Sequence, residues 1–109
     1  MATTYKVLGQ SNPSATTATT LYTVPASTEA VLSTIVVANQ AASAGTYRLA
    51  IRPDGESLAA KHYLAYDVAI AANSTHTYTI GVTLNAADVI TVYASSASQS
   101  FNAFGSEIA

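Results

Sequence analysis

The chain has 109 residues, enough for one domain that buries roughly 60–70% of the surface its unfolded form exposes. It contains no cysteine, which excludes a disulfide framework and a thiolate metal site. The formal net charge is -2, and only four side chains are basic, namely Lys6, Arg48, Arg52 and Lys61. So few cations exclude nucleic acid as a partner, because its binding depends on neutralising phosphates.

The proportion of charged residues is unusually low. It is 9%, against about 25% in ordinary soluble domains, so we expect less surface charge than a free monomer carries. No apolar run approaches the roughly 18 residues of a membrane span. Residues 1–4 lack the basic and apolar regions of a signal peptide. We therefore expect no membrane partner and a protein that is made and kept soluble in the cell that synthesises it.

The N-terminal residues 1–19 are rich in Thr, Ser and Ala, with a short apolar piece at 5–8 and a breaker at Asn12-Pro13. Such a segment has too little apolar area to fold alone. We interpret it as an N-terminal arm or edge strand, and residues 20–109 as a β-sandwich domain. Residues 21–24 predict a short strand that Pro25 ends, because proline cannot donate to a strand ladder.

Residues 29–39 form the longest stretch of β-branched and aliphatic residues and predict the central strand. Strict alternation places Val31, Ile35 and Val37 on one face. It places Leu32, Val36 and Ala38 on the other. Neither face is polar, so we expect both to be covered, either by a second sheet and a loop or by a neighbouring subunit.

Residues 46–52 alternate cleanly, with Tyr47, Leu49 and Ile51 inward and the two arginines outward. Residues 39–52 therefore predict the turn and return strand of a hairpin. Pro53-Asp54-Gly55 supplies the next turn. Residues 56–61 fit either one helical turn or a crossover loop.

Four strands are predicted in the remainder, at 62–70, 75–84, 89–94 and 100–108. Alternation puts Leu64, Tyr66, Val68 and Ile70 on one face of the first. In the second, Tyr78, Ile80, Val82 and Leu84 point one way and the threonines the other. The spacing over residues 66–94 suggests a meander within one sheet. Seven or so strands without a helix predict an all-β fold, a two-layer antiparallel β-sandwich of jelly-roll or immunoglobulin-like type.

Catalytic and metal-binding motifs are absent from the sequence. His62, His76 and Asp67 are the material for a metal or acid–base site, but they lie on different predicted strands without a short linking motif. No serine stands in a nucleophile-elbow pattern. Most carboxylates sit where turns or strand starts need polar residues. We therefore expect no enzyme activity, no catalytic residue, no cofactor and no metal.

The seven tyrosines suit a sugar-stacking platform, since each has an apolar ring and a polar tip. Most of them, however, fall in phase with core aliphatic residues. We assign Tyr47, Tyr66 and Tyr78 to the core and leave Tyr63 and Tyr93 open. As candidate partner contacts we name Tyr5, Lys6, Lys61 and Tyr63.

The chain as a whole resembles a family of short structural proteins from tailed bacteriophage particles, especially those of cyanobacterial and other aquatic hosts. The likeness rests on YKVLGQ at 5–10, TLYTVPA at 20–26, STIVVAN at 33–39, HYLAYDV at 62–68, 84–95 and FNAFGSE at 101–107. These motifs are structural, and they span nearly the full length. The resemblance implies a virion component without enzymatic activity, made in the host cytoplasm.

From this resemblance we expect a capsid decoration (cement) protein that stabilises the head. It would form a homotrimer or other cyclic oligomer and bind the major capsid protein or another virion protein. A small sandwich with an arm and little charge suits a position on a shell. The alternatives are a tail, baseplate or fibre accessory protein and, in a different class, a glycan- or receptor-binding module.

Overall fold

The fold is known from a computed structural model that describes residues 2–109. Eight strands follow in chain order: β1 (Thr3–Ser11), β2 (Thr19–Thr23), β3 (Glu29–Asn39), β4 (Gly45–Arg52), β5 (Tyr63–Ile70), β6 (Thr75–Leu84), β7 (Val89–Ala94) and β8 (Gln99–Ile108). Two single-turn 3-10 helices, η1 (Pro53–Gly55) and η2 (Ala60–His62), lie between β4 and β5. The segment before β5 thus contains a helical turn, one of the two forms expected there.

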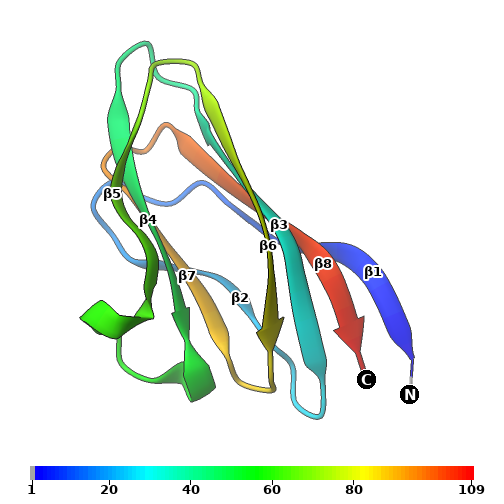
Figure 1. The fold of residues 1–109 in the computed structure, drawn as a ribbon. Helices are drawn as coiled ribbons and strands as arrows, with labels where there is room; N and C mark the ends of the chain where they lie inside the picture. Colours follow the sequence, from blue (N-terminus) through cyan, green and yellow to red (C-terminus); the bar gives the residue numbers. More distant parts are fainter. Residues whose placement is uncertain (1) are drawn as a thin grey trace.

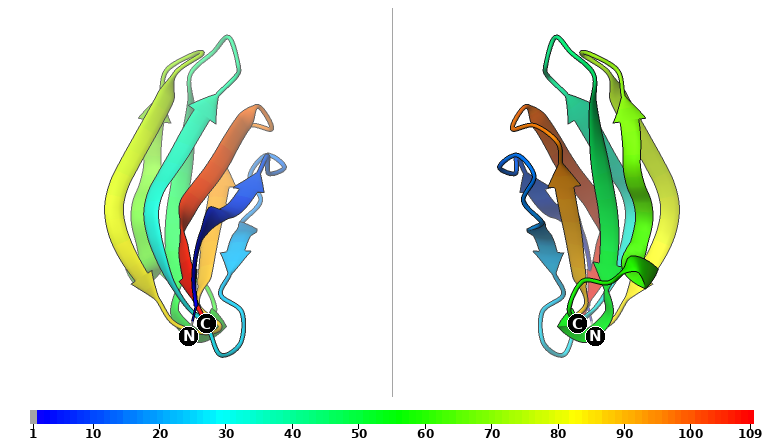
Figure 2. Two further views of the ribbon diagram at one scale, coloured as in Figure 1. Left: turned by 90° about the vertical axis from the view of Figure 1, so that its right-hand side faces the viewer. Right: turned by 90° about the vertical axis from the view of Figure 1, so that its left-hand side faces the viewer.

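The strands form two four-stranded antiparallel sheets packed face to face (Figure 1). Sheet A has the order β1-β8-β3-β6, and sheet B has the order β2-β7-β4-β5. The predicted β-sandwich is confirmed, and eight strands in these two orders make it a jelly roll. Figure 2 looks onto the outer face of sheet A in its left view and onto that of sheet B in its right view.

Two predictions about strand neighbours were wrong. β3 lies in sheet A and β4 in sheet B, so residues 39–52 cross between layers and do not form a hairpin. β5, β6 and β7 alternate between the sheets, so they form no meander. Short loops join strands across a sandwich as easily as along one sheet, because stacked sheets are only about 10 Å apart. The single connection within a sheet is that from β4 to β5.

The core lies between the sheets and is built on β3, β4, β7 and β8. The side chains with no exposed surface include Val37, Tyr47, Ile70, Val92 and Phe101. The rings of Tyr47 and Phe101 meet edge to face, with centroids 6.2 Å apart, the geometry that aromatic pairs prefer. Tyr47 is thus confirmed as a core residue, and Tyr78 is half-buried against the same cluster.

Strict alternation failed in β3 because a β-bulge interrupts it. Ser33 is an extra residue relative to β8, where Leu32 pairs with Gly105 and Thr34 with the adjacent Phe104. The extra residue shifts the phase of the strand, so Leu32 is buried and joins the core. Val31, predicted to share the core face of Ile35, is half-buried on the other side.

The outer face of β3 has no covering layer among residues 2–109, and its side chains are half-buried by their own neighbours alone. Sheet B covers the inner face. A neighbouring subunit over the outer face stays a prediction.

β1 is the edge strand of sheet A and pairs with β8 over its length. Its Leu8 is buried in the core, and Ala2 and Ala109 exchange backbone hydrogen bonds of 2.8 and 2.9 Å. Both chain ends therefore lie together at one end of the sandwich (Figure 2).

Candidate ligand-binding surface

A group of tyrosines surrounds an arginine on the outer face of sheet B. This tyrosine–arginine cluster consists of Arg48 on β4, Tyr63, Tyr66 and Asp67 on β5, and Tyr93 on β7. The register brings β4 and β7 into contact at Arg48 and Tyr93, which are direct partners. Side chains of paired residues project from the same face of a sheet, so both point away from the core that Tyr47 and Leu49 enter.

Two irregularities in β5 bring its tyrosines to this same face. Against β4, Tyr66 and Asp67 together face the single residue Arg48, and Leu64 has no partner between the pairs Leu49–Ala65 and Ala50–Tyr63. Asp67 has a φ of 50°, a left-handed conformation that marks the first bulge. In a regular strand, residues 63 and 66 would project to opposite faces. Here the ring centroids of Tyr63 and Tyr66 lie 4.8 Å apart, at an interplanar angle of 85°.

The prediction that Tyr66 belongs to the core was therefore wrong, because the bulge turns its ring outward and leaves it 56% exposed. Leu64, assigned to the same face as Val68, is also exposed. Ile80 of β6 is exposed for the same reason. β6 has an extra residue beside Gly81, whose φ is 57°, between the pairs Leu32–Val82 and Thr34–Thr79.

The guanidinium of Arg48 lies between two aromatic rings. Its central carbon is 4.2 Å from the ring centroid of Tyr66 and 4.2 Å from that of Tyr93, within the range of cation–π attraction. Its Nε donates to Oδ1 of Asp67 at 2.7 Å and Nη2 donates to Oδ2 at 3.4 Å. The hydrogen bonds to Asp67 raise the pKa of Arg48 above its ordinary value. This paired cation therefore stays charged and fixed in orientation.

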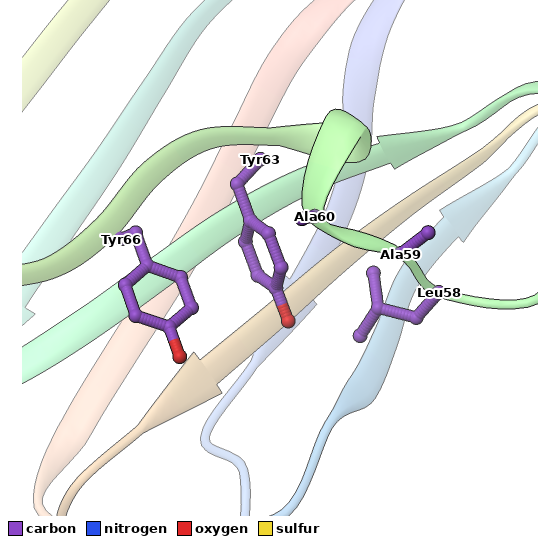
Figure 3. Close-up of a pocket in the computed structure, with 5 residues that line it drawn as sticks. All are labelled: Leu58, Ala59, Ala60, Tyr63 and Tyr66. Atoms are coloured by element: carbon purple, nitrogen blue, oxygen red, sulfur yellow. The ribbon is translucent and has the colours of Figure 1, made fainter.

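A pocket of about 500 Å³ opens beside these rings, lined by Leu58, Ala59, Ala60, Tyr63 and Tyr66 (Figure 3). The close-up shows the ring of Tyr63 between Tyr66 on one side and Leu58 on the other. The volume of the pocket lies within the range of roughly 300–1,000 Å³ that is typical of small-molecule sites. The wall is apolar, and the polar atoms of the lining side chains are the two phenol hydroxyls.

His62 holds the segment that forms the far wall of the pocket. It is buried, and its Nδ1 accepts the backbone N–H of Ala59 at 3.0 Å. Because Nδ1 is an acceptor, the neutral ring carries its proton on Nε2, which donates to Glu56 at 3.2 Å. This hydrogen bond, together with Lys61 at 3.5 Å, lowers the pKa of Glu56. The role of His62 in these contacts is to position the loop.

The four predicted contact residues lie on two separate surfaces. Tyr63 lines the pocket, and Lys61, two residues before it in the chain, pairs with Glu56. Tyr5 is highly exposed on the outer face of sheet A. Lys6, its neighbour on β1, points to the opposite side and pairs with Glu107 at 3.2 Å. Sequence reasoning missed Arg48, Tyr66 and Asp67, which a strict two-residue period cannot bring together.

The second histidine is far from this surface. Nδ1 of His76 lies 2.7 Å from the hydroxyl of Tyr47, which also bonds the hydroxyl of Tyr78 inside the sandwich. Burial is the main reason that the pKa of Tyr47 is raised. Within residues 2–109, no three His, Cys, Asp or Glu side chains gather as a metal site would require.

A second surface, the outer face of sheet A, is almost free of charge. The register directs the following side chains away from sheet B: Tyr5, Val7, Val31, Thr34, Val36, Thr75, Thr77, Thr79, Thr83, Asn102 and Phe104. Tyr5, Val7 and Phe104 are among the exposed large apolar residues. Among the side chains of sheet A that point outward within residues 2–109, the one that carries a charge is Glu29, at the margin of the face. We call this surface the uncharged face.

Comparison of the chain with protein-family models, curated protein sequences and solved structures found no significant match. The structure contains no helix within residues 2–109 of the length and apolarity needed to span a bilayer.

Proposed function

We propose that the protein is a structural component of a tailed-phage particle, most specifically a decoration protein that lies on the capsid and stabilises the head. The observation that carries this proposal is the uncharged face of sheet A. Contiguous exposed apolar surface on a small domain marks an interaction site, and charged residues are depleted in the cores of protein interfaces.

The fold and the sequence resemblance support the same role. Eight-stranded jelly rolls occur in viral capsid domains, although fold alone never identifies a function. The sequence resembles short virion proteins over nearly its whole length. A particle offers many identical positions, so a contact that is weak for one copy gains strength when the copies bind as a cyclic oligomer.

Sheet A is better suited than sheet B to a broad protein contact. Its outer face is formed by four strands whose side chains are mostly threonine, valine and aromatic residues, with uncharged polar residues such as Asn102. Such residues are removed from water without the desolvation cost of a buried charge. Sheet B instead exposes ion pairs such as Arg48 with Asp67.

Sedimentation of the purified protein with undecorated capsids, and separately with isolated tails, tests the proposal. Sedimentation with capsids supports decoration of the head. Sedimentation with tails alone would contradict decoration of the head and would identify the tail, baseplate or fibre as the binding partner. Failure to bind either particle overturns a structural role in the virion.

A matched pair of variants tests which face makes the contact. Val7 and Leu64 are both apolar, 46% and 51% exposed, and both lie on edge strands, one in each sheet. We expect Val7→Asp to lower occupancy on the particle at least tenfold, because a charge is buried in the interface. Leu64→Asp should leave occupancy unchanged, and the reverse pattern would contradict the assignment to sheet A.

A further inference from the structure

We propose that the pocket beside Tyr63 and Tyr66 binds a neutral carbohydrate, with a sugar ring stacked on these tyrosines. This inference is separate from the proposed place of the protein in a particle, because it concerns the other sheet. Its basis is the exposed ring of Tyr66 and the half-buried ring of Tyr63 at one pocket, with the Arg48–Asp67 ion pair beside Tyr66 and a balance of charge around them.

The aromatic part of the site matches the two-sided chemistry of a sugar ring. A pyranose has an apolar C–H face and a rim of hydroxyl groups, while a tyrosine offers a ring face and a hydroxyl. The rings of Tyr63 and Tyr66 stand at 85° to each other. They therefore form a corner in which one ring stacks on a sugar face and the other contacts its edge. Leu58 closes the opposite side (Figure 3).

The polar part of the site is held ready for hydroxyl groups. Arg48 and Asp67 bond each other through Nε and Nη2, and no hydrogen bond of Nη1 is found among residues 2–109. An arginine presents five N–H donors in a fixed plane, and a carboxylate accepts at several positions. Neighbouring hydroxyls of a sugar both donate and accept, so they suit such a pair.

The balance of charge argues against other ligands. Arg48 is matched by Asp67 at 2.7 Å, and Lys61 by Glu56 at 3.5 Å. A phosphate or other anion site keeps an excess of cations. Arg48 already occupies the position that a cationic ligand would take over the rings of Tyr66 and Tyr93. A proline-rich peptide lies in grooves between aromatic ridges, whereas these two rings are perpendicular and form a single corner.

Contacts within the chain also hold the parts of the site in place. The β5 bulges fix the backbone of both tyrosines, the Arg48 sandwich fixes the ring of Tyr66, and His62 fixes Ala59. A preformed site loses little conformational entropy on binding. Weak sugar contacts therefore retain most of their strength.

NMR titration of the full chain tests the proposal with galactose, glucose, mannose, N-acetylglucosamine and their neutral oligomers, and separately with inorganic phosphate and a proline-rich peptide. We expect saturable shifts at the amides of the tyrosine–arginine cluster with at least one neutral sugar. Tyr66→Ala should weaken that affinity about three- to tenfold. Tyr5→Ala is the matched control, because Tyr5 is an exposed tyrosine on the other sheet, and it should leave the affinity for the sugar unchanged.

Three results would overturn the inference. They are no sugar binding up to about 50 mM, binding that Tyr66→Ala leaves unchanged, and binding confined to phosphate or to the peptide. Tyr66 is exposed, so its replacement should leave the fold intact, which the unchanged NMR spectrum outside the pocket would verify. Particle binding measured with the same variant separates this inference from the proposed structural role, because Tyr66→Ala should leave particle binding intact.

Discussion

Removing the hydroxyl of Tyr22 should destabilise the sandwich at the end where both termini lie. Tyr22, on sheet B, donates a hydrogen bond to Oε2 of Glu107 on sheet A. Lys6 on β1 approaches the other carboxylate oxygen at 3.2 Å. One carboxylate thus joins three strands from two sheets, so Tyr22→Phe tests how far the polar contact at this end secures the packing.

The expected loss follows from the burial of the two partners. Tyr22 is buried, and the side chain of Glu107 is only 16% exposed. A hydrogen bond to a charged group contributes about 1.5–3 kcal/mol, so Tyr22→Phe should lower the free energy of unfolding by that amount. This is roughly 5–15 °C in Tm for a domain of about 100 residues. Lys6 is 43% exposed, and its replacement by Met should cost less than about 1 kcal/mol.

The same contact predicts a dependence on acid. The hydrogen bond from Tyr22, followed by Lys6, lowers the pKa of Glu107 below its ordinary 4.5. A carboxyl whose pKa is lower in the folded state stabilises the fold above about pH 4.5 and loses that contribution as the pH falls through the folded-state pKa. Burial and this hydrogen bond raise the pKa of Tyr22. Its contribution is therefore present below pH 10 and lost in stronger alkali.

Urea unfolding at pH 7 and pH 3 measures the stability lost in Tyr22→Phe and the dependence of stability on the protonation of Glu107. Wild type should lose more stability between these values than Glu107→Gln, and Tyr5→Phe, which removes an exposed hydroxyl, should match wild type at both. A Tyr22→Phe variant within about 0.5 kcal/mol of wild type at pH 7 would refute the reasoning, since it would mean that water replaces the bond at no cost.

Three further predictions concern the core, the sheet and the pocket wall. Phe101→Ala should lower stability by about 3–5 kcal/mol, seen as a fall in the urea midpoint, because its ring has no exposed surface. Gly105→Ala should cost at least about 1–3 kcal/mol in the same assay, since a Cβ there would lie 1.9 Å from the carbonyl oxygen of Val31. Below about pH 4.5 the lowered pKa of Glu56 predicts a smaller protection factor for amide exchange at Ala59, as protonation of Glu56 weakens its bond to the buried histidine.

The layer architecture was predictable from the sequence because most strands keep the two-residue period. Tyr47, Leu49 and Ile51 alternate as expected, and β4 contributes its inward side chains to the core. The period records which face a residue occupies and carries no information on the neighbouring strand. Loops of four or five residues fit a hairpin and a crossing between sheets equally well, so the topology required the structure.

The ligand-binding surface was not predictable because it depends on departures from that period. A single extra residue reverses the face of every side chain beyond it. Asp67 marks such a position through its positive φ, which aspartate tolerates better than most residues. An aspartate inside an otherwise apolar strand was the available signal. This aspartate could not show how far the register of β5 is shifted, and it is this shift that brings Tyr66 beside Tyr63.

The two proposals fit one geometry because the jelly roll separates its outer faces. Sheet A and sheet B share a core, so their outer surfaces point in opposite directions (Figure 2). A copy held to a particle through the uncharged face would therefore present the tyrosine–arginine cluster to the surroundings. Changes on the two faces should then act independently, since residues far apart with no shared partners have additive effects. A protein of this kind would attach by one sheet and recognise sugars by the other, which neither strand pairing nor composition alone would suggest.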